Sequence, residues 1–183
     1  MGYWDTPGQS DEWYTPPAVF GALGCRFDLD VAPARFGQDH VPADERLHGD
    51  GLAALWGGFV WMNPPFGGRN GIAPWLDRFF DHGDGIALTP DRTSAPWFWR
   101  AWVRADLVLF TRKIRFLRPD GSEGVSPSNG TALWAVGGRG CFALRQASSA
   151  GFGILATPAG GALVANRLSD PTPPRSLTHT QGA

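Results

Sequence analysis

Short apolar runs alternate with helical segments along this chain, and that alternation constrains the fold more than any other feature. The strand-like runs lie at residues 26–32, 59–62, 85–90, 106–110, 113–117 and 131–137. The segments with helix signals lie at residues 15–24, 74–83 and 94–105. Apolar runs of about four to eight residues between turn signals are typical of buried strands, whereas apolar positions three and four apart favour helices. The alternation predicts an α/β sheet.

The ends of the chain and its connections carry weaker signals. Residues 33–50 are rich in charge, proline and glycine and are predicted to be a loop with about one turn of helix. The run at 131–137 follows a turn-rich loop, so we expect it to pair antiparallel with 106–110 or 113–117. The polar tail 169–183 is predicted to be disordered, which leaves residues 1–168 as a single domain.

The composition allows a soluble domain and indicates no particular partner. Of 183 residues, 43% are apolar and 18% are charged, so the chain can bury a sizeable core. The net charge of −1 does not indicate a nucleic-acid binder, although a local basic patch would be enough for one. The two cysteines and four histidines lack metal-ligand spacing, so we expect no metal site and no disulfide. No apolar stretch could span a membrane and no targeting segment is visible, which predicts a cytoplasmic protein.

The turn after residues 59–62 is unusual because Asn63 is followed by Pro64, Pro65 and Phe66. Each proline fixes φ near about −65° and offers no N–H, and Asn63 before a proline is held extended. The turn is therefore expected to be stiff, with the Asn63 amide oxygen and the Pro64 carbonyl as two acceptors beside the Phe66 ring. In α/β sheets ligands bind at the carboxyl ends of strands, where this turn lies.

Two acceptors and a flat apolar ring suit a planar exocyclic amine. Both N–H bonds of an –NH2 group can be held while its ring stacks on Phe66, so that the nitrogen is aimed at an electrophile. A methyl group on a sulfonium is such an electrophile, and SN2 transfer to the nitrogen would be accelerated mainly by positioning and charge complementarity. A sulfonium is already activated, so this chemistry needs no metal. The alternative is a plain turn after a strand, since short motifs match by chance.

Several segments together resemble the phage-type, Dam-like DNA N6-adenine methyltransferases. The matching pieces occur in the family's order across residues 11–137: DEWYTPPAVFGAL, FDLDVAPA, GDGL, FVWMNPPFG, GIALTPDRTSAPWF, TRKIRFL and SPSNGTALWAVG. The resemblance implies a Rossmann-like, S-adenosylmethionine-dependent methyltransferase sheet that is mostly parallel with an antiparallel edge strand. It implies double-stranded DNA as partner and suggests a phage or prophage source.

The resemblance also implies roles for individual residues. The motif that holds a flipped target adenine is matched by Asn63, Pro64, Pro65 and Phe66. The residues expected beside S-adenosylmethionine are Trp13, Thr15, Pro16, Asp28, Asp30 and Asp50. Either Asp28 or Asp30 matches the acidic strand end that meets the cofactor, and acids there suit ribose hydroxyls and a cationic sulfonium. The alternatives are solvated or capping acids, with Trp13 as a core anchor and Thr15 as the cap of the first helix.

Duplex DNA would need a basic surface, because the target adenine must be flipped out and phosphate contacts offset part of that cost. The candidates for DNA contact are Arg69, Arg92, Arg112, Lys113, Arg115, Arg118, Ser128 and Asn129. The basic residues could equally form a solvated face, and Asn129-Gly130 could be an ordinary hairpin turn.

The chain departs from the larger methyltransferases in lacking a Phe-x-Gly-x-Gly cofactor loop, and its motif ends in Phe66 rather than Tyr. Stacking does not require the tyrosine hydroxyl. Two other interpretations stay open: a methyltransferase that acts on RNA or on a protein amide, and a DNA-binding protein that has lost catalysis. The sequence leaves the oligomeric state and the recognition site undetermined.

Overall fold

The computed structural model describes residues 13–33, 40–65, 71–125, 127 and 129–158, so the predicted disordered tail lies outside it. The strands are β1 (Phe27–Asp30), β2 (Ala43–Arg46), β3 (Val60–Met62), β4 (Gly85–Pro90), β5 (Leu107–Thr111), β6 (Thr131–Val136) and β7 (Gly153–Ala156). The helices are α1 (Pro17–Leu23), α2 (Ala73–His82), α3 (Pro96–Trp102) and α4 (Gly137–Ser149). All seven described strands form one sheet in the order β2-β1-β3-β4-β6-β5-β7.

The sheet is mixed, which confirms the α/β class. β1 pairs parallel with β2 and β3, and β3 pairs parallel with β4. β6 lies antiparallel between β4 and β5, and β7 lies antiparallel beside β5. The expected antiparallel pairing of residues 131–137 with 106–110 is confirmed. The antiparallel strand β6 is internal, however, and the edge is closed by β7 from the weakly marked residues 153–156.

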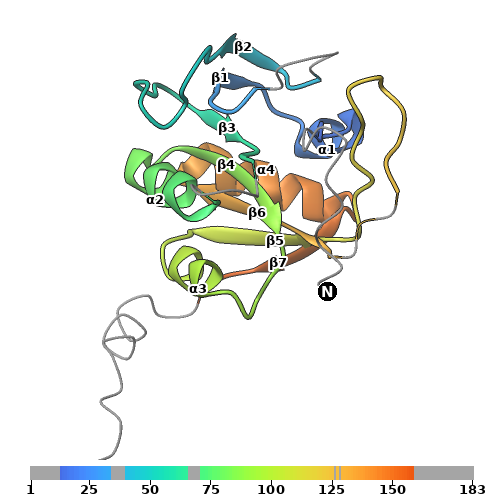
Figure 1. Cartoon of the computed structure of the whole chain (residues 1–183). Helices are drawn as coiled ribbons and strands as arrows, with labels where there is room; N and C mark the ends of the chain where they lie inside the picture. Colours follow the sequence, from blue (N-terminus) through green and yellow to red (C-terminus); the bar gives the residue numbers. More distant parts are fainter. Residues whose placement is uncertain (1–12, 34–39, 66–70, 126, 128, 159–183) are drawn as a thin grey trace, which may run out of the picture.

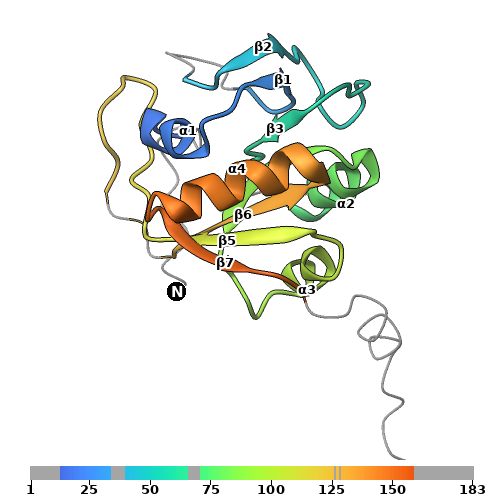
Figure 2. The same cartoon turned by 180° about the vertical axis from the view of Figure 1, so that it is seen from behind.

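Helices cover both faces of the sheet (Figures 1 and 2). One face packs against α2 and α3 through buried aromatic side chains that include Phe79, Phe98 and Trp134. The other face packs against α1 and α4 around Leu23, Leu144 and a cluster of strand side chains. Because both faces are covered, ligands have access to the sheet mainly at the ends of its strands.

Three segments differ from the sequence-based prediction. Residues 43–46 were expected in a loop but form the edge strand β2, and residues 137–149 form the long helix α4. Residues 113–117 do not form a strand. Leu117 makes two isolated antiparallel bridges, with Tyr14 and with Glu123, in the long connection that projects beside α1 in Figure 1.

The order of the strands places a topological switch at the carboxyl ends of β1 and β3. The chain goes from β1 to β2 on one side and then returns to β3 on the other side of β1. Connections that leave in opposite directions open a crevice at the strand ends, which is where α/β sheets bind ligands. Asn63 directly follows β3 and therefore lies at this crevice. Among the described helices, none has both the length and the apolar character that crossing a bilayer requires.

Candidate active site

The side-chain amide of Asn63 is held by the N-terminal segment rather than by its own turn. Its Nδ2 donates to the Thr15 hydroxyl at 3.2 Å and to the Trp13 carbonyl at 3.4 Å. The Trp13 carbonyl can only accept, so it fixes which end of the amide is nitrogen. These contacts bring the N-terminal segment and the Asn-Pro-Pro turn together.

The other end of the same amide lacks a partner. Asn63 Oδ1 is buried and accepts no hydrogen bond from any residue that the structure describes. A buried acceptor without a donor costs about 1–3 kcal/mol, so such atoms in native proteins call for an explanation. Next to it, Pro64 is buried and Pro65 is exposed. The turn therefore carries an acceptor that a ligand N–H group could satisfy.

Thr15 does not cap α1, contrary to one of the sequence interpretations. The helix begins at Pro17 after Pro16, and no side chain caps it by a hydrogen bond. Pro16 contributes its carbonyl, which accepts the Val19 N–H at 3.1 Å. The Thr15 side chain is only 4% exposed and its hydroxyl faces Asn63 instead.

Trp13 and Tyr14 join the site to the connection between β5 and β6. Tyr14 and Leu117 exchange two backbone hydrogen bonds of 2.9 Å each. The Trp13 ring lies against Gly124, where a Cβ would come within 2.5 Å of the ring. Trp13 remains 40% exposed, so it is a partly open aromatic surface rather than a core anchor.

The two acids nearest the crevice are Asp30 and Asp50. Asp30 ends β1, is 1% exposed, and accepts the Ala32 N–H at 3.1 Å. Asp50 is exposed and accepts the Leu52 N–H at 2.9 Å, which begins a short turn. That turn packs on the end of β1, because a Cβ on Gly51 would lie 2.3 Å from the Val31 carbonyl oxygen. Asp30 and Asp50 thus both lie at the carboxyl end of β1.

Asp28, the alternative to Asp30 as the acidic strand end, makes its contacts elsewhere. It accepts the Phe59 N–H at 2.6 Å, just before β3, and pairs with Arg139 at 3.1 Å. Arg139 also pairs at 2.7 Å with Asp84, which precedes β4. These contacts place Asp28 at the amino ends of β3 and β4, away from Asn63. The Phe59 N–H, followed by Arg139, holds the pKa of Asp28 below its usual value.

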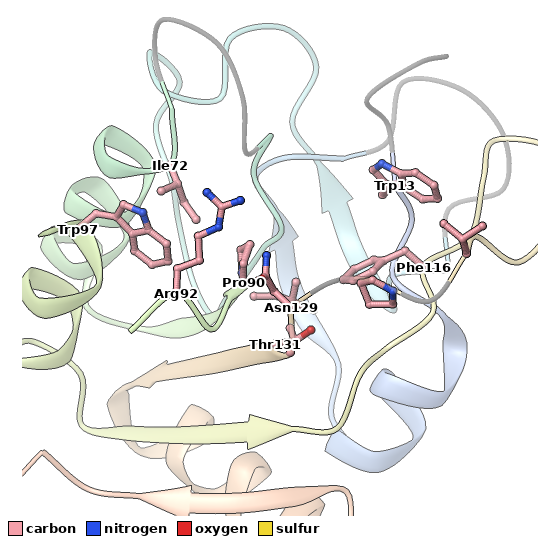
Figure 3. A pocket seen from close by; sticks show the side chains of 12 residues that line it. Trp13, Ile72, Pro90, Arg92, Trp97, Phe116, Asn129 and Thr131 are labelled. Carbon is pink, nitrogen blue, oxygen red and sulfur yellow. The ribbon is translucent and has the colours of Figure 1, made fainter. Parts of the chain in front are cut away.

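A pocket of about 420 Å³ includes Trp13, the residue whose carbonyl accepts from Asn63, in its lining (Figure 3). Trp13 and Phe116 lie on one side of it, and Ile72, Arg92 and Trp97 lie on the other (Figure 3). Its remaining lining includes Pro90, Asn129 and Thr131, from the carboxyl end of β4 and the amino end of β6. An apolar pocket of this size with a few polar groups is typical of a small-molecule site. It shares Trp13 with the Asn63 amide.

Two pocket residues, Trp97 and Phe116, were missed as site residues. Phe116 belongs to the alternating stretch 113–117, in which Ile114 is buried while Lys113 and Arg115 are exposed. That alternation indicates a buried side of the segment, but it led only to the prediction of a strand and not of a site residue. Trp97 lies in the first turn of α3 and was read as part of an amphipathic helix, so no sequence signal separated it from core aromatics.

Among the basic residues predicted to contact DNA, some have a protein partner and others have no ion pair within the described chain. Arg115 pairs with Glu123 at 3.4 Å, and Arg118 donates to the Glu123 carbonyl at 2.8 Å. Arg112 and Lys113 are exposed and have no ion-pair partner in the described part of the chain. Arg92 lines the pocket with Asn129. Phe66, Arg69 and Ser128 lie outside the described residues.

The two thiols lie outside this site and have raised pKa values. Burial raises the pKa of Cys25 to about 11 and also raises that of Cys141, with Asp106 adding to the second. A thiol is nucleophilic only as the thiolate, so neither cysteine is suited to covalent catalysis. The described residues contain no group of three or more His, Cys, Asp or Glu side chains arranged to hold a metal ion.

Comparisons with known proteins leave the family of this chain open. No protein-family model matches it, and neither the curated proteins nor the solved structures contain a match.

Proposed function

We propose that this protein is a DNA adenine-N6 methyltransferase that transfers a methyl group from S-adenosylmethionine to a flipped adenine. One observation carries the proposal: Asn63 offers a buried oxygen without a donor among the described residues, at the switch between β1 and β3, and its amide is bonded to Trp13, which lines an aromatic pocket. An exocyclic amine would supply the missing N–H. The adjacent Pro64 carbonyl is the second acceptor that the sequence predicts for the same amino group.

The pocket suits the rest of the base. Trp13, Trp97 and Phe116 give it apolar walls on opposite sides. Taking a base out of the duplex costs a few kcal/mol in lost stacking and pairing, and such surfaces can replace the lost stacking. Asn129 lies in the same wall and can donate or accept at a base edge. These features support a planar heterocycle with an amino group as the substrate.

The acids at the end of β1 suit the cofactor. Asp30 offers a buried carboxylate there, and Asp50 lies on the turn that packs on the same strand end. A carboxylate favours ribose hydroxyls, an ammonium group or a nearby sulfonium charge. When bound, S-adenosylmethionine would supply an electrophilic methyl group: the N–C bond would form as the methyl–sulfur bond breaks, the neutral thioether would leave, and the nitrogen would release one proton. The role of Asn63 in this step is to hold the amine so that its nitrogen faces the methyl group.

Methyl transfer from labelled S-adenosylmethionine to unmethylated duplex DNA would test the proposal. We expect N6-methyladenine among the product nucleosides, resolved by mass spectrometry, and its loss in Asn63→Ala. Asp28→Ala is the matched control, because Asp28 lies at the opposite ends of the strands. We expect it to retain activity.

Three outcomes would contradict the proposal in different ways. Label found in RNA or in protein but not in DNA would change the substrate class. Cofactor binding without any transfer, or no cofactor binding at all, would favour a DNA-binding protein without catalysis. Full activity in Asn63→Ala would show that the site is wrong.

A further inference from the structure

The amide of Asn63 could rotate about its side chain, and only one orientation presents the oxygen to a substrate N–H. Its two hydrogen bonds to the N-terminal segment decide which end is held. Rotation by a half turn would face Oδ1 toward the Trp13 carbonyl oxygen, so that two acceptors would repel each other. The segment preceding α1 therefore selects the orientation in which Oδ1 is left for another donor.

We propose that the Thr15 hydroxyl and the Trp13 carbonyl act as a clasp that orients the Asn63 amide toward the substrate amine, which makes Thr15 a positioning residue for methyl transfer. This inference rests on the proposed function. It assigns Thr15 a role different from the cofactor contact that the sequence resemblance implies. The name clasp refers below to these two groups alone.

The clasp has a chemical effect as well as a geometric one. When an amide N–H donates a hydrogen bond, resonance moves electron density onto the amide oxygen. Hydrogen bonds arranged in a chain polarise one another, so Oδ1 becomes a stronger acceptor. Asn63 Nδ2 donates to two acceptors, at 3.2 and 3.4 Å. The clasp thus strengthens the acceptor that would hold the substrate amine.

Burial makes the hydroxyl of Thr15 hard to replace. The residue is 4% exposed, so water has little access to take over the hydrogen bond if the hydroxyl is removed. Valine has the shape of threonine without the hydroxyl. Thr15→Val should therefore keep the packing and remove one of the two groups that hold the amide, whereas Thr15→Ser keeps the hydroxyl.

Steady-state methylation kinetics on duplex DNA would test the inference. We expect Thr15→Val to lower kcat by about tenfold, as the loss of one hydrogen bond that acts in the transition state would do. The KM for DNA and the affinity for S-adenosylmethionine should stay within about twofold, and Thr15→Ser should restore most of kcat. Thr89→Val is the matched control, because Thr89 is also buried and its hydroxyl accepts a hydrogen bond from Trp134 in the core. It should lower thermal stability and leave kcat unchanged.

Two kinetic results would overturn the inference. One is an unchanged kcat in Thr15→Val. The other is a loss confined to cofactor affinity, which would make Thr15 a cofactor contact instead. A fall in kcat that Thr15→Ser does not restore would also contradict it, because packing rather than the hydroxyl would then be responsible.

The side-chain NMR signals of Asn63 separate the clasp from the proposed function. We expect its amide protons to exchange slowly with solvent in the wild type and faster in Thr15→Val. Protection that is unchanged in Thr15→Val would overturn the clasp, whatever the activity. A third result is possible, in which protection is lost in Thr15→Val but the wild-type protein methylates no DNA. That result would support the clasp and overturn the proposed function.

Discussion

Asp28 and Asp30 lie two residues apart on β1, yet their surroundings suit opposite purposes. Asp30 is buried at the carboxyl end of the strand, beside the crevice. Asp28 is about half exposed and is held by the Phe59 N–H and by Arg139 near the other end of the neighbouring strands. We infer that Asp28 stabilises the fold, whereas Asp30 would contact the cofactor under the proposed function.

The lowered pKa of Asp28 gives this inference a pH dependence. A carboxyl whose pKa is depressed by folding adds stability above its unfolded pKa of about 3.9, and that stability is lost as the pH falls through the folded pKa. Asp28→Asn should therefore lower the melting temperature at pH 7, and its difference from the wild type should shrink below about pH 4. Solvent screening limits the effect to at most about 1 kcal/mol. Thermal unfolding measured at several pH values would check it.

Binding of S-adenosylmethionine separates the two acids directly. We expect Asp30→Asn to weaken it by about tenfold or more, which corresponds to one lost charge-assisted contact of about 1.5–3 kcal/mol. Asp28→Asn should leave the dissociation constant unchanged. Titration calorimetry on both variants would measure this, and equal weakening in the two would show that Asp28 lies closer to the cofactor than its contacts indicate.

At the scale of elements, α4 shows how packing can override local preference. Its sequence begins with glycines, which disfavour a helix interior by about 1 kcal/mol each relative to alanine. Gly140 explains one of them, because a Cβ there would lie 2.7 Å from the Gly85 carbonyl oxygen and 3.1 Å from Ala135 Cβ. The absence of a side chain lets the helix approach the sheet closely. Gly138 has no such neighbour within 4 Å.

Alanine at these two glycines should therefore have opposite effects. Gly140→Ala should destabilise the protein by about 1–3 kcal/mol, because α4 would have to move away from β4 and β6. Gly138→Ala should stabilise it by about 0.5–1 kcal/mol through the lower entropy of the unfolded chain. Urea unfolding of both variants would measure the two free energies. Destabilisation of similar size in both would mean that close approach at Gly140 is not the reason for its glycine.

The sequence predicted those elements whose buried side chains form a pattern within the element itself. Strands β1, β3, β4, β5 and β6 and helices α1, α2 and α3 form at the apolar runs and amphipathic segments that indicate them. β2 was missed because its residues, Ala-Asp-Glu-Arg, are charged, as suits an exposed edge strand. Residues 113–117 were read as a strand because their burial does alternate. Their backbone lies beside Tyr14 instead of joining the sheet.

The site was predictable only in part, for a related reason. A motif placed after a buried strand singles out Asn63 as a candidate, because that placement is encoded within a few residues. The contact between Asn63 and Thr15 joins residues 48 positions apart. Nothing local in the sequence encodes it, since it depends on how the chain before α1 crosses the end of β3. The same holds for the pocket, whose lining comes from segments far apart in the sequence, between Trp13 and Thr131.

At the scale of the whole molecule, a net charge of −1 means that DNA binding has to come from a local excess of positive charge. Many arginines are already engaged, since Arg26, Arg104, Arg115 and Arg139 all pair with carboxylates. The exposed pair Arg112 and Lys113 follows β5 and leads into the connection that supplies Phe116 to the pocket. Under the proposed function, these two residues would meet the phosphates beside a flipped base.

The salt dependence of DNA binding would test this placement. Each phosphate contact contributes about 0.9 to the slope of log K against log salt concentration. Replacing both Arg112 and Lys113 by alanine should therefore lower the slope by about 2 and weaken binding most at low salt. Arg26→Ala is the matched control, because Arg26 is equally basic but pairs with Asp44 at 2.6 Å, and it precedes β1 at the ends of the strands away from Asn63. Fluorescence anisotropy with a short labelled duplex would give both slopes. The slope could instead fall as much in Arg26→Ala as in the double variant. DNA binding would then depend on the total charge of the protein rather than on this surface, because the position of a lost charge matters only where it contacts a defined phosphate.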